Sequence, residues 1–194
     1  MDWSVILSSC IVAATTIISI FLKELIQNKN SKKNSCIIEY TKKNQNVEKA
    51  IRFALTELDA DRVHIYEFHN GDHFYSGNHQ QKFSCTYEAL SAGVSSEALN
   101  LQDLRVSTFN QFIHKVVNDF KFEISDVEKL NDSLLRNWLE SRGIASSFSF
   151  PVRTLNKNVI GIINIDFTKQ KEKLTEEEVN FIIQQSKIIG GYLI

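Results

Sequence analysis

The sequence has 194 residues, of which 43% are hydrophobic and 23% are charged, and its formal net charge is -1. This balance is that of an ordinary globular protein, and it excludes a strongly basic surface that would draw the whole chain to nucleic acid. The three cysteines, Cys10, Cys36 and Cys85, are too few and too widely spaced for a disulfide framework or a cysteine-based zinc site.

The first expected element is a membrane-spanning helix from Ser4 to Leu22. These 19 residues carry no charge, and as a helix they span about 28 Å, close to the hydrocarbon thickness of a bilayer. A cleaved signal peptide and a buried soluble helix are the alternatives, but the start Met1-Asp2-Trp3 lacks the positive charge that a signal peptide needs. We therefore expect residues 1–26 to anchor the protein in the lipid bilayer as a single-pass span.

A polar linker rich in lysine and asparagine is expected over residues 27–45. Residues 23–50 hold seven lysines and three glutamates, whereas no basic residue precedes the expected span. Because positive charge favours the cytoplasmic side of a membrane, we expect the soluble domain to lie in the cytoplasm.

Residues 46–194 are expected to form an α+β domain with an antiparallel sheet. Apolar residues recur at helical spacing in some segments and alternate with polar residues in others. Asp132 is placed to cap a helix that Gly143 ends, and Thr175 with Glu178 forms a capping box. The expected elements are a helix over 47–58, strands over 62–70 and 82–90, helices over 108–119 and 133–141, strands over 144–152 and 158–167, and a helix over 176–193.

The segment "LESRGIASSFSFPVRTLNKNVIGIINIDFTKQKEKLTEEEVNFIIQQSKIIGGYL" resembles the second half of a GAF domain. The resemblance is carried by the step Phe150-Pro151-Val152, by Gly161 within its strand, and by the acidic start of a long closing helix. It implies a GAF-like antiparallel sheet flanked by helices, with a ligand pocket between the sheet and its covering loops. It also implies dimerisation through terminal helices, so we expect a homo-oligomer with a sensory or regulatory role.

A second resemblance concerns architecture. One N-terminal membrane helix followed by a compact α+β domain is similar to the holins of T-even phages, and the Asn/Lys-rich, Pro-poor composition suits an AT-rich phage genome. Those holins place the soluble domain outside the cytoplasm, whereas the lysines here favour the inside. A holin-like or virion-associated phage protein, whose soluble domain regulates assembly, is the alternative function.

The candidate ligand site is the stretch "EFHNGDHFYSG", residues 67–77, together with neighbouring strand positions. Asn70-Gly71 and Gly77-Asn78 predict two tight turns around a short aromatic flap that could cover a small molecule or contact a protein partner. The alternative is that the aromatic residues are core and the polar ones cap a hairpin. The candidate residues are Tyr66, Phe68, His69, Asn70, Asp72, His73, Phe74, Tyr75, Phe83 and Tyr87.

The sequence gives little support for catalysis. His69 and His73 are expected to diverge in a loop, so no metal site is predicted, and no cofactor motif is present. Cys85 is expected to be a small buried hydrophobic residue, with a GAF-type redox enzyme as the alternative. Asn164 and Asp166 are expected to face solvent or a covering loop, with a pocket-lining role as the alternative. We therefore expect neither enzyme activity nor nucleic-acid binding.

Overall fold

The computed structural model describes the backbone of residues 3–74 and 76–194, and the side chains of residues 15, 17–24, 37–74 and 76–194. The chain divides into two compact units, residues 1–43 and 44–194. One helix, α1 (Trp3–Glu57), begins in the first unit and ends in the second. The polar segment 27–45 therefore has helical backbone.

The described residues of the first unit, 3–43, are helical. Its described apolar side chains are exposed at Ile17, Ile18, Ile20, Phe21, Leu22, Ile37, Ile38 and Tyr40. Among the residues that the structure describes, no helix is long and apolar enough to cross a membrane. The side chains of residues 4–14 and 16, which make up much of the expected span Ser4–Leu22, lie outside the described residues, so the membrane anchor stays a prediction.

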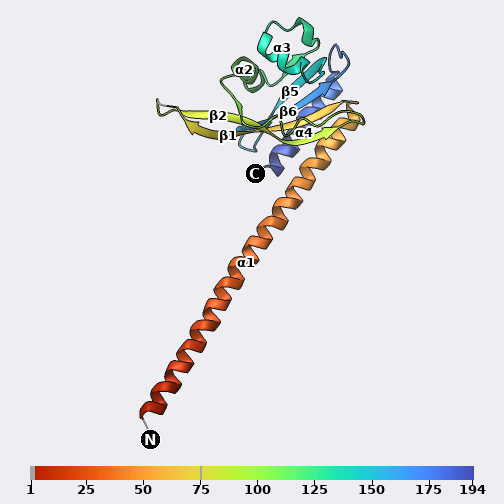
Figure 1. Ribbon diagram of the computed structural model, residues 1–194. Coiled ribbons are helices and arrows are strands. Elements are labelled where there is room, and N and C mark those ends of the chain that lie inside the picture. Colours follow the sequence, from red (N-terminus) through yellow and green to blue (C-terminus); the bar gives the residue numbers. More distant parts are fainter. Residues whose placement is uncertain (1–2, 75) are drawn as a thin grey trace. The chain divides into compact units, whose positions relative to one another are not determined.

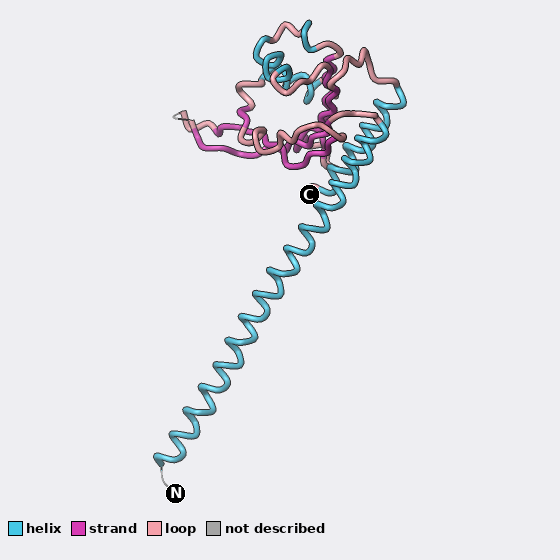
Figure 2. Tube along the Cα trace, turned by 45° about the vertical axis from the view of Figure 1, so that its right-hand side comes forward, coloured by secondary structure: helices cyan, strands magenta, loops and turns pink. Residues whose placement is uncertain are grey.

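A six-stranded antiparallel sheet forms the centre of the second unit (Figure 1). Its strands are β1 (Arg62–His73), β2 (His79–Leu90), β3 (Leu104–Arg105), β4 (Phe122–Ile124), β5 (Ser146–Arg153) and β6 (Val159–Phe167). They lie in the order β3-β2-β1-β6-β5-β4, which places β1 and β6 in the middle. In Figure 2 the strands are magenta, and the β1–β2 hairpin reaches out beyond the other strands. The α+β class and the hairpins β1–β2 and β5–β6 are as the sequence predicted.

Helices cover both faces of this sheet. On one face, residues 44–57 of α1 and the closing helix α4 (Glu176–Tyr192) enclose a core that includes Val63, Ile65 and Ile163. On the other face lie α2 (Asn110–Asn118), the short 3₁₀ helix η1 (Val127–Lys129) and α3 (Ser133–Glu140). Because successive strand side chains point to opposite faces, the residues between those of the first core face α2 and α3.

The two caps predicted at helix starts are confirmed in detail. The Asp132 carboxylate accepts hydrogen bonds from the backbone nitrogens of Leu134 and Leu135, at 3.1 Å each, at the start of α3. Thr175 and Glu178 form a complete capping box at the start of α4.

A glycine is needed at position 161 of β6 for a steric reason, since a Cβ there would lie 2.2 Å from the carbonyl oxygen of Tyr66 in the neighbouring strand.

The prediction of a turn at Asn70-Gly71 is wrong. Strand β1 continues to His73, and Gly71 lies inside it at an irregularity in the pairing with β2. A Cβ at Gly71 would lie 3.0 Å from the carbonyl oxygen of Gln80, so the small residue here allows a close strand approach. The chain reverses over residues 74–78, where Gly77 has a φ of +82°. The strands of the hairpin are therefore longer than the sequence suggested, and fewer residues form its turn.

Candidate functional site

A cluster of buried polar residues lies at the middle of the sheet on the face covered by α2 and α3. Its centre is His64 of β1, whose side chain is 0% exposed. The cross-strand register pairs His64 with Glu88 of β2 on one side and with Asn164 of β6 on the other. His64 Nε2 lies 3.0 Å from Glu88 Oε1, and His64 Nδ1 lies 3.4 Å from Asp166 Oδ2. The histidine is thus held between two carboxylates.

Two serines of β5 extend this cluster. Ser147 Oγ donates a hydrogen bond of 2.6 Å to Asp166 Oδ1, which also accepts one of 2.7 Å from Asn164 Nδ2. Ser147 and Ser149 both contact Asn164 Oδ1. Asn164 is 2% exposed and Asp166 is 1% exposed, so of the surroundings expected for them, which were solvent, a covering loop or a pocket, solvent is wrong. Their burial is possible because the serines on β5 supply the hydrogen bonds that water would otherwise provide.

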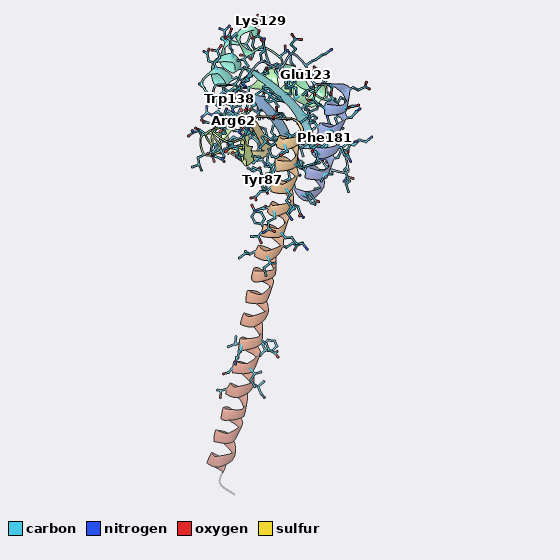
Figure 3. All side chains as sticks on the ribbon, turned by 90° about the vertical axis from the view of Figure 1, so that its right-hand side faces the viewer. Arg62, Tyr87, Glu123, Lys129, Trp138 and Phe181 are labelled. Carbon is cyan, nitrogen blue, oxygen red and sulfur yellow. The ribbon has the colours of Figure 1, made fainter. Side chains whose placement is uncertain are left out.

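Two buried arginines border the cluster. Arg142, just beyond α3, places its guanidinium carbon 3.7 Å from the ring centroid of Trp138 and donates from Nε to the Trp138 carbonyl at 3.2 Å. Arg62 Nη1 donates to the Arg142 carbonyl at 2.7 Å. Figure 3 labels Arg62 and Trp138 on this side of the sheet, and Phe181 on α4, which covers the opposite face. The two arginines bring positive charge to the buried carboxylates.

Several polar atoms of this cluster are buried without a hydrogen-bond partner among the described residues. They are Arg62 Nε, Tyr66 OH, Arg142 Nη1 and Nη2, His64 Nδ1 and Asp166 Oδ2. Leaving a buried donor or acceptor unsatisfied costs about 1–3 kcal/mol, so such groups seldom gather in a core without a role. The concentration of unsatisfied atoms on one face marks this cluster as the candidate site.

The ionisation of the cluster follows from its contacts. Burial alone would lower the pKa of His64, but the contacts with Asp166 and Glu88 raise it above the ordinary value of 6.5. For Glu88 the signs are reversed. Burial alone would raise its pKa, but hydrogen bonds from His64, Ser96 and the Glu97 backbone lower it to about 2. The pKa of Asp166 is also lowered, because contacts with His64 and Arg142 outweigh its burial. Below pH 6.5, a protonated His64 therefore faces two ionised carboxylates.

Of the residues that the sequence proposed for the site, Tyr66 belongs to this cluster through its hydroxyl, whereas most of the others lie elsewhere. Tyr66 and Phe83, predicted as pocket walls, are fully buried in the core beneath α2, with ring centroids 5.6 Å apart, and Phe68 packs against the same core. His64, Glu88, Arg62 and Arg142 were missed. The signal that could have found His64 is a charged residue between Val63 and Ile65, inside a strand that is otherwise apolar at its start.

Tyr87 does not belong with the other predicted wall residues. A bulge in β2 pairs Ile65 with Tyr87 and Tyr66 with Cys85, so Thr86 is an extra residue between them. Tyr87 therefore packs against the α1 and α4 core, where its hydroxyl donates a hydrogen bond of 2.6 Å to Asn44 Oδ1. The expectation of a shared face assumed regular alternation, which the bulge breaks.

The polar residues predicted at the hairpin lie along its outer part. His69 Nε2 is 2.9 Å from Ser84 Oγ, and Asn70 Oδ1 accepts a hydrogen bond of 3.1 Å from Gln81. Asp72 and His73 are exposed, with the His73 and His79 rings 4.1 Å apart, and Phe74 is 47% exposed. Tyr75 lies outside the described residues. Within the described part of the chain, no group of three or more His, Cys, Asp or Glu side chains could hold a metal ion.

A separate apolar cavity of about 580 Å³ lies away from the hairpin. It is formed by the turn between β5 and β6, by the face of α4 and by Phe120. Its lining residues are Phe120, Phe150, Pro151, Arg153, Thr154, Leu155, Lys157, Ile183, Ser186 and Lys187. This cavity contains none of the residues that the sequence proposed as ligand-binding.

Cys85 is placed as a core residue, as the sequence predicted. It is 3% exposed, and burial raises the pKa of its thiol to about 12. A nucleophilic cysteine needs a lowered pKa and access to its substrate, so this thiol does not fit a redox enzyme. With Cys10 and Cys36 replaced by serine, we expect native protein at pH 8 to resist iodoacetamide at Cys85 and urea-unfolded protein to react fully, as read by mass spectrometry. Equal labelling rates in the two states would contradict the buried, protonated thiol.

Comparison with known proteins finds no matching family model and no matching curated sequence. Solved structures do match. The blue-light-absorbing GAF domain of PixJ from Thermosynechococcus elongatus is 15% identical, with a TM-score of 0.62 over 78% of this chain and 84% of that one. A phycocyanobilin-bound GAF domain from a cyanobacterial phytochrome is 17% identical, with a TM-score of 0.57 over 74% and 80%.

A third solved structure is the GAF domain region of a proposed membrane protein from Geobacter sulfurreducens PCA. It is 11% identical, with a TM-score of 0.64 over 82% of this chain and 97% of that one. At these identities the likeness concerns the fold and carries no residue roles. The antiparallel sheet with α1 and α4 on one face and α2 and α3 on the other is therefore a GAF-like fold.

Proposed function

We propose that this protein is a membrane-anchored, non-enzymatic regulatory module whose GAF-like domain binds a small ligand on the sheet face covered by α2 and α3. The observation that carries this proposal is the buried cluster around His64, in which donors and acceptors on β1, β6 and the end of α3 lack hydrogen-bond partners among the described residues. A ligand in contact with these atoms would supply the missing hydrogen bonds. The phycocyanobilin-bound neighbour supports a ligand-binding use of this fold.

Helix α1 could transmit a change caused by ligand binding, because it continues from the GAF-like domain into the N-terminal part of the chain. Val47, Ile51 and Ala54 of α1 are buried against the sheet, in the same core as Val63 and Ile65. These two residues flank His64, so a ligand that moves β1 changes the surface on which α1 packs. We propose that the domain reports ligand binding through this helix.

A tryptophan signal can test the ligand-binding function. Trp3 and Trp138 are the two tryptophans of the sequence, so a Trp3→Phe variant reports only Trp138, which stacks on Arg142. We expect at least one compound in a panel of small anionic, neutral and cationic metabolites to change this fluorescence and raise the melting temperature of the full chain in detergent. If no compound changes either quantity, the ligand-binding function is wrong.

We propose that Ser4–Leu22 anchors the protein in the bilayer, that residues 44–194 lie in the cytoplasm, and that the protein is a homo-oligomer. The uncharged span and the lysines that follow it support the anchor and its orientation. Exposed apolar side chains on α1 and α4, such as Phe53 and Ile188, together with the apolar cavity beside α4, support association through these helices.

Membrane attachment and topology can be measured together. We expect the full chain to stay in the membrane fraction after alkaline carbonate washing, and its domain to survive protease added outside intact cells. Arginines at Val12 and Ile18 should release the protein, because each costs about 2.5–3.5 kcal/mol near the centre of a bilayer. Arginines at Ile37 and Ile38, outside the expected span, are the matched control. Removal of the domain by external protease would contradict the cytoplasmic placement and favour the holin-type arrangement.

A further inference from the structure

The guanidinium of Arg142 is fixed in place while its outer edge stays unpaired. Stacking on Trp138 holds its plane, and the bond from Nε to the Trp138 carbonyl holds its inner edge. Nη1 and Nη2 are buried and have no hydrogen-bond partner within the described chain. Two parallel N–H groups on one edge match the two oxygens of a carboxylate, which arginine binds in a bidentate manner.

The cluster brings three positive and three negative groups together. Arg62, Arg142 and the protonated His64 face two buried carboxylates, Glu88 and Asp166. A third carboxylate, Asp61, lies beside Arg62 at the edge of this group. The formal charges therefore balance, and the case for an anion rests on the unpaired Nη1–Nη2 edge of Arg142.

Two of the three carboxylates in or beside the cluster, Glu88 and Asp61, already accept hydrogen bonds. Glu88 accepts hydrogen bonds from His64, Ser96 and the backbone nitrogen of Glu97. Asp61 accepts hydrogen bonds from Thr168 and Ser91. These groups are therefore occupied, and neither is hydrogen-bonded to the free edge of Arg142.

Among the described residues, Asp166 is the carboxylate that could compete for that edge. Its Oδ1 accepts from Ser147 and Asn164, whereas its Oδ2 lies 3.4 Å from His64 Nδ1 and has no hydrogen-bond partner among the described atoms. Closure of Arg142 onto Asp166 Oδ2 would satisfy both groups without any ligand. If Arg142 instead closes onto Asp166, an added carboxylate compound should change neither the Trp138 fluorescence nor the melting temperature.

A second free donor lies in the same cluster. The Tyr66 hydroxyl is buried and makes no hydrogen bond of ordinary length with the described residues, although it lies close enough to the Arg142 side chain for that contact to act against the rise in the pKa of Tyr66 that burial causes. Burial raises the pKa of Tyr66, so the phenol keeps its proton and can donate a hydrogen bond, while the Arg142 charge acts in the opposite direction on that pKa. Both free donors therefore suit an acceptor and not a cation.

Aromatic packing limits the size of the ligand. The ring centroids of Phe83 and Phe109 are 5.7 Å apart, and those of Phe109 and Trp138 are 4.9 Å apart. These side chains, with Tyr66, fill the space between the sheet and α2. A large planar chromophore would have to displace this core, whereas the smallest carboxylates are only slightly larger than water.

We infer that the ligand is a small carboxylate anion bound end-on by the Nη1–Nη2 edge of Arg142, with the Tyr66 hydroxyl as a further donor. This inference rests on the proposed function, since it names the chemical class of ligand for the same site. Arg142 binds the anion directly. Trp138, which stacks on the guanidinium, and Arg62, which donates to the Arg142 carbonyl, hold Arg142 in position.

Matched anionic and neutral probes test this inference. The full chain carrying Trp3→Phe is titrated with formate and acetate at constant ionic strength, and with formamide and acetamide, which have nearly the same shape and no charge. We expect the two anions to shift Trp138 fluorescence saturably and raise the melting temperature, and the amides to do neither. Arg142→Gln should weaken anion binding at least about tenfold, and Tyr66→Phe about threefold to tenfold.

The variants keep the inference separate from a loss of folding. Tyr66→Phe preserves the ring packing, so its melting temperature without ligand checks that the core is intact, and Arg142→Lys keeps the charge but loses the two-pronged edge. Anion binding that is unchanged in Arg142→Gln would overturn the inference, as would a folded protein that binds only neutral or cationic compounds. That second result would leave the proposed function standing, whereas no response to any compound would remove both.

Discussion

Replacing Gly190 with alanine is expected to lower the free energy of unfolding by about 2–3 kcal/mol, because it overpacks a contact between a helix and a strand. A Cβ at Gly190 would lie 2.1 Å from the carbonyl oxygen of Arg153 and 3.0 Å from its carbonyl carbon. Both are backbone atoms of β5, so no side-chain rotation can relieve the clash. Helix α4 would have to move away from the core that contains Ile189 and Val152.

The neighbouring glycine provides a matched control for this prediction. A Cβ at Gly191 meets no atom within 4 Å, although both glycines lie in the last turns of α4. Alanine favours a helix over glycine by up to about 1 kcal/mol, so Gly191→Ala should be neutral or stabilising. Urea unfolding of the full-length variants in the same detergent measures the difference. Equal effects of the two substitutions would show that α4 does not approach β5 this closely.

The features that the sequence predicted well depend on residues close together in the chain. The cap at Asp132 and the capping box at Thr175 involve neighbours two or three residues away, and both formed as expected. Gly161 was identified from its place in a family pattern, and the structure adds the reason, which is the approach of the Tyr66 carbonyl. Hydrophobic periodicity likewise predicted the helices and the two main hairpins, because each period reports which face of an element is buried.

The candidate site could not be predicted in the same way, because it depends on the register between strands. From the sequence, Asn164 and Asp166 are polar positions of an alternating strand, which are usually outward-facing. The strand register shows that Ser147 and Ser149 lie opposite them and hydrogen-bond to them. Tyr87 was predicted to line the pocket, but the bulge at Thr86 places it on the other face of the sheet. Arg142 lies in a polar segment after a short helix, and only the fold shows that its guanidinium is buried beside Trp138.

Replacing Asp166 with asparagine is expected to lower the free energy of unfolding by about 3–5 kcal/mol, the usual cost of removing one partner from a buried ion pair. The asparagine keeps the size of the side chain, and its oxygen can still accept from Ser147 and Asn164. What it removes is the negative charge that faces His64 and Arg142. The loss therefore measures buried charge pairing and not packing.

Ser149→Ala is the control for this substitution. It removes a neutral hydroxyl from the same cluster, and Asn164 Oδ1 still accepts a hydrogen bond from Ser147. We expect it to cost about 1 kcal/mol, as for an ordinary hydrogen bond. Chemical denaturation at pH 6 compares the two variants with the wild type. Similar losses for both would mean that the charge on Asp166 does not stabilise the fold.

The pH dependence of stability tests the same pairing. Because the pKa of His64 is raised in the folded state, its contribution is complete below its ordinary value of 6.5 and is lost as pH rises through the folded pKa. Glu88 acts in the opposite direction, since its contribution is present above 4.5 and is lost as pH falls towards a folded pKa of about 2. The contribution of this pair is therefore largest between pH 4.5 and 6.5.

Asp166→Asn should change the alkaline side of this profile. Without the Asp166 carboxylate the pKa of His64 falls, so the proton that stabilises the folded wild type is bound less tightly. The difference in unfolding free energy between wild type and variant should then be greatest below pH 6.5 and should narrow as His64 loses its proton. Denaturation at a series of pH values from 4 to 9 measures this difference. Parallel curves across that range would show that Asp166 is not coupled to the protonation of His64, and that the carboxylates around this histidine act independently.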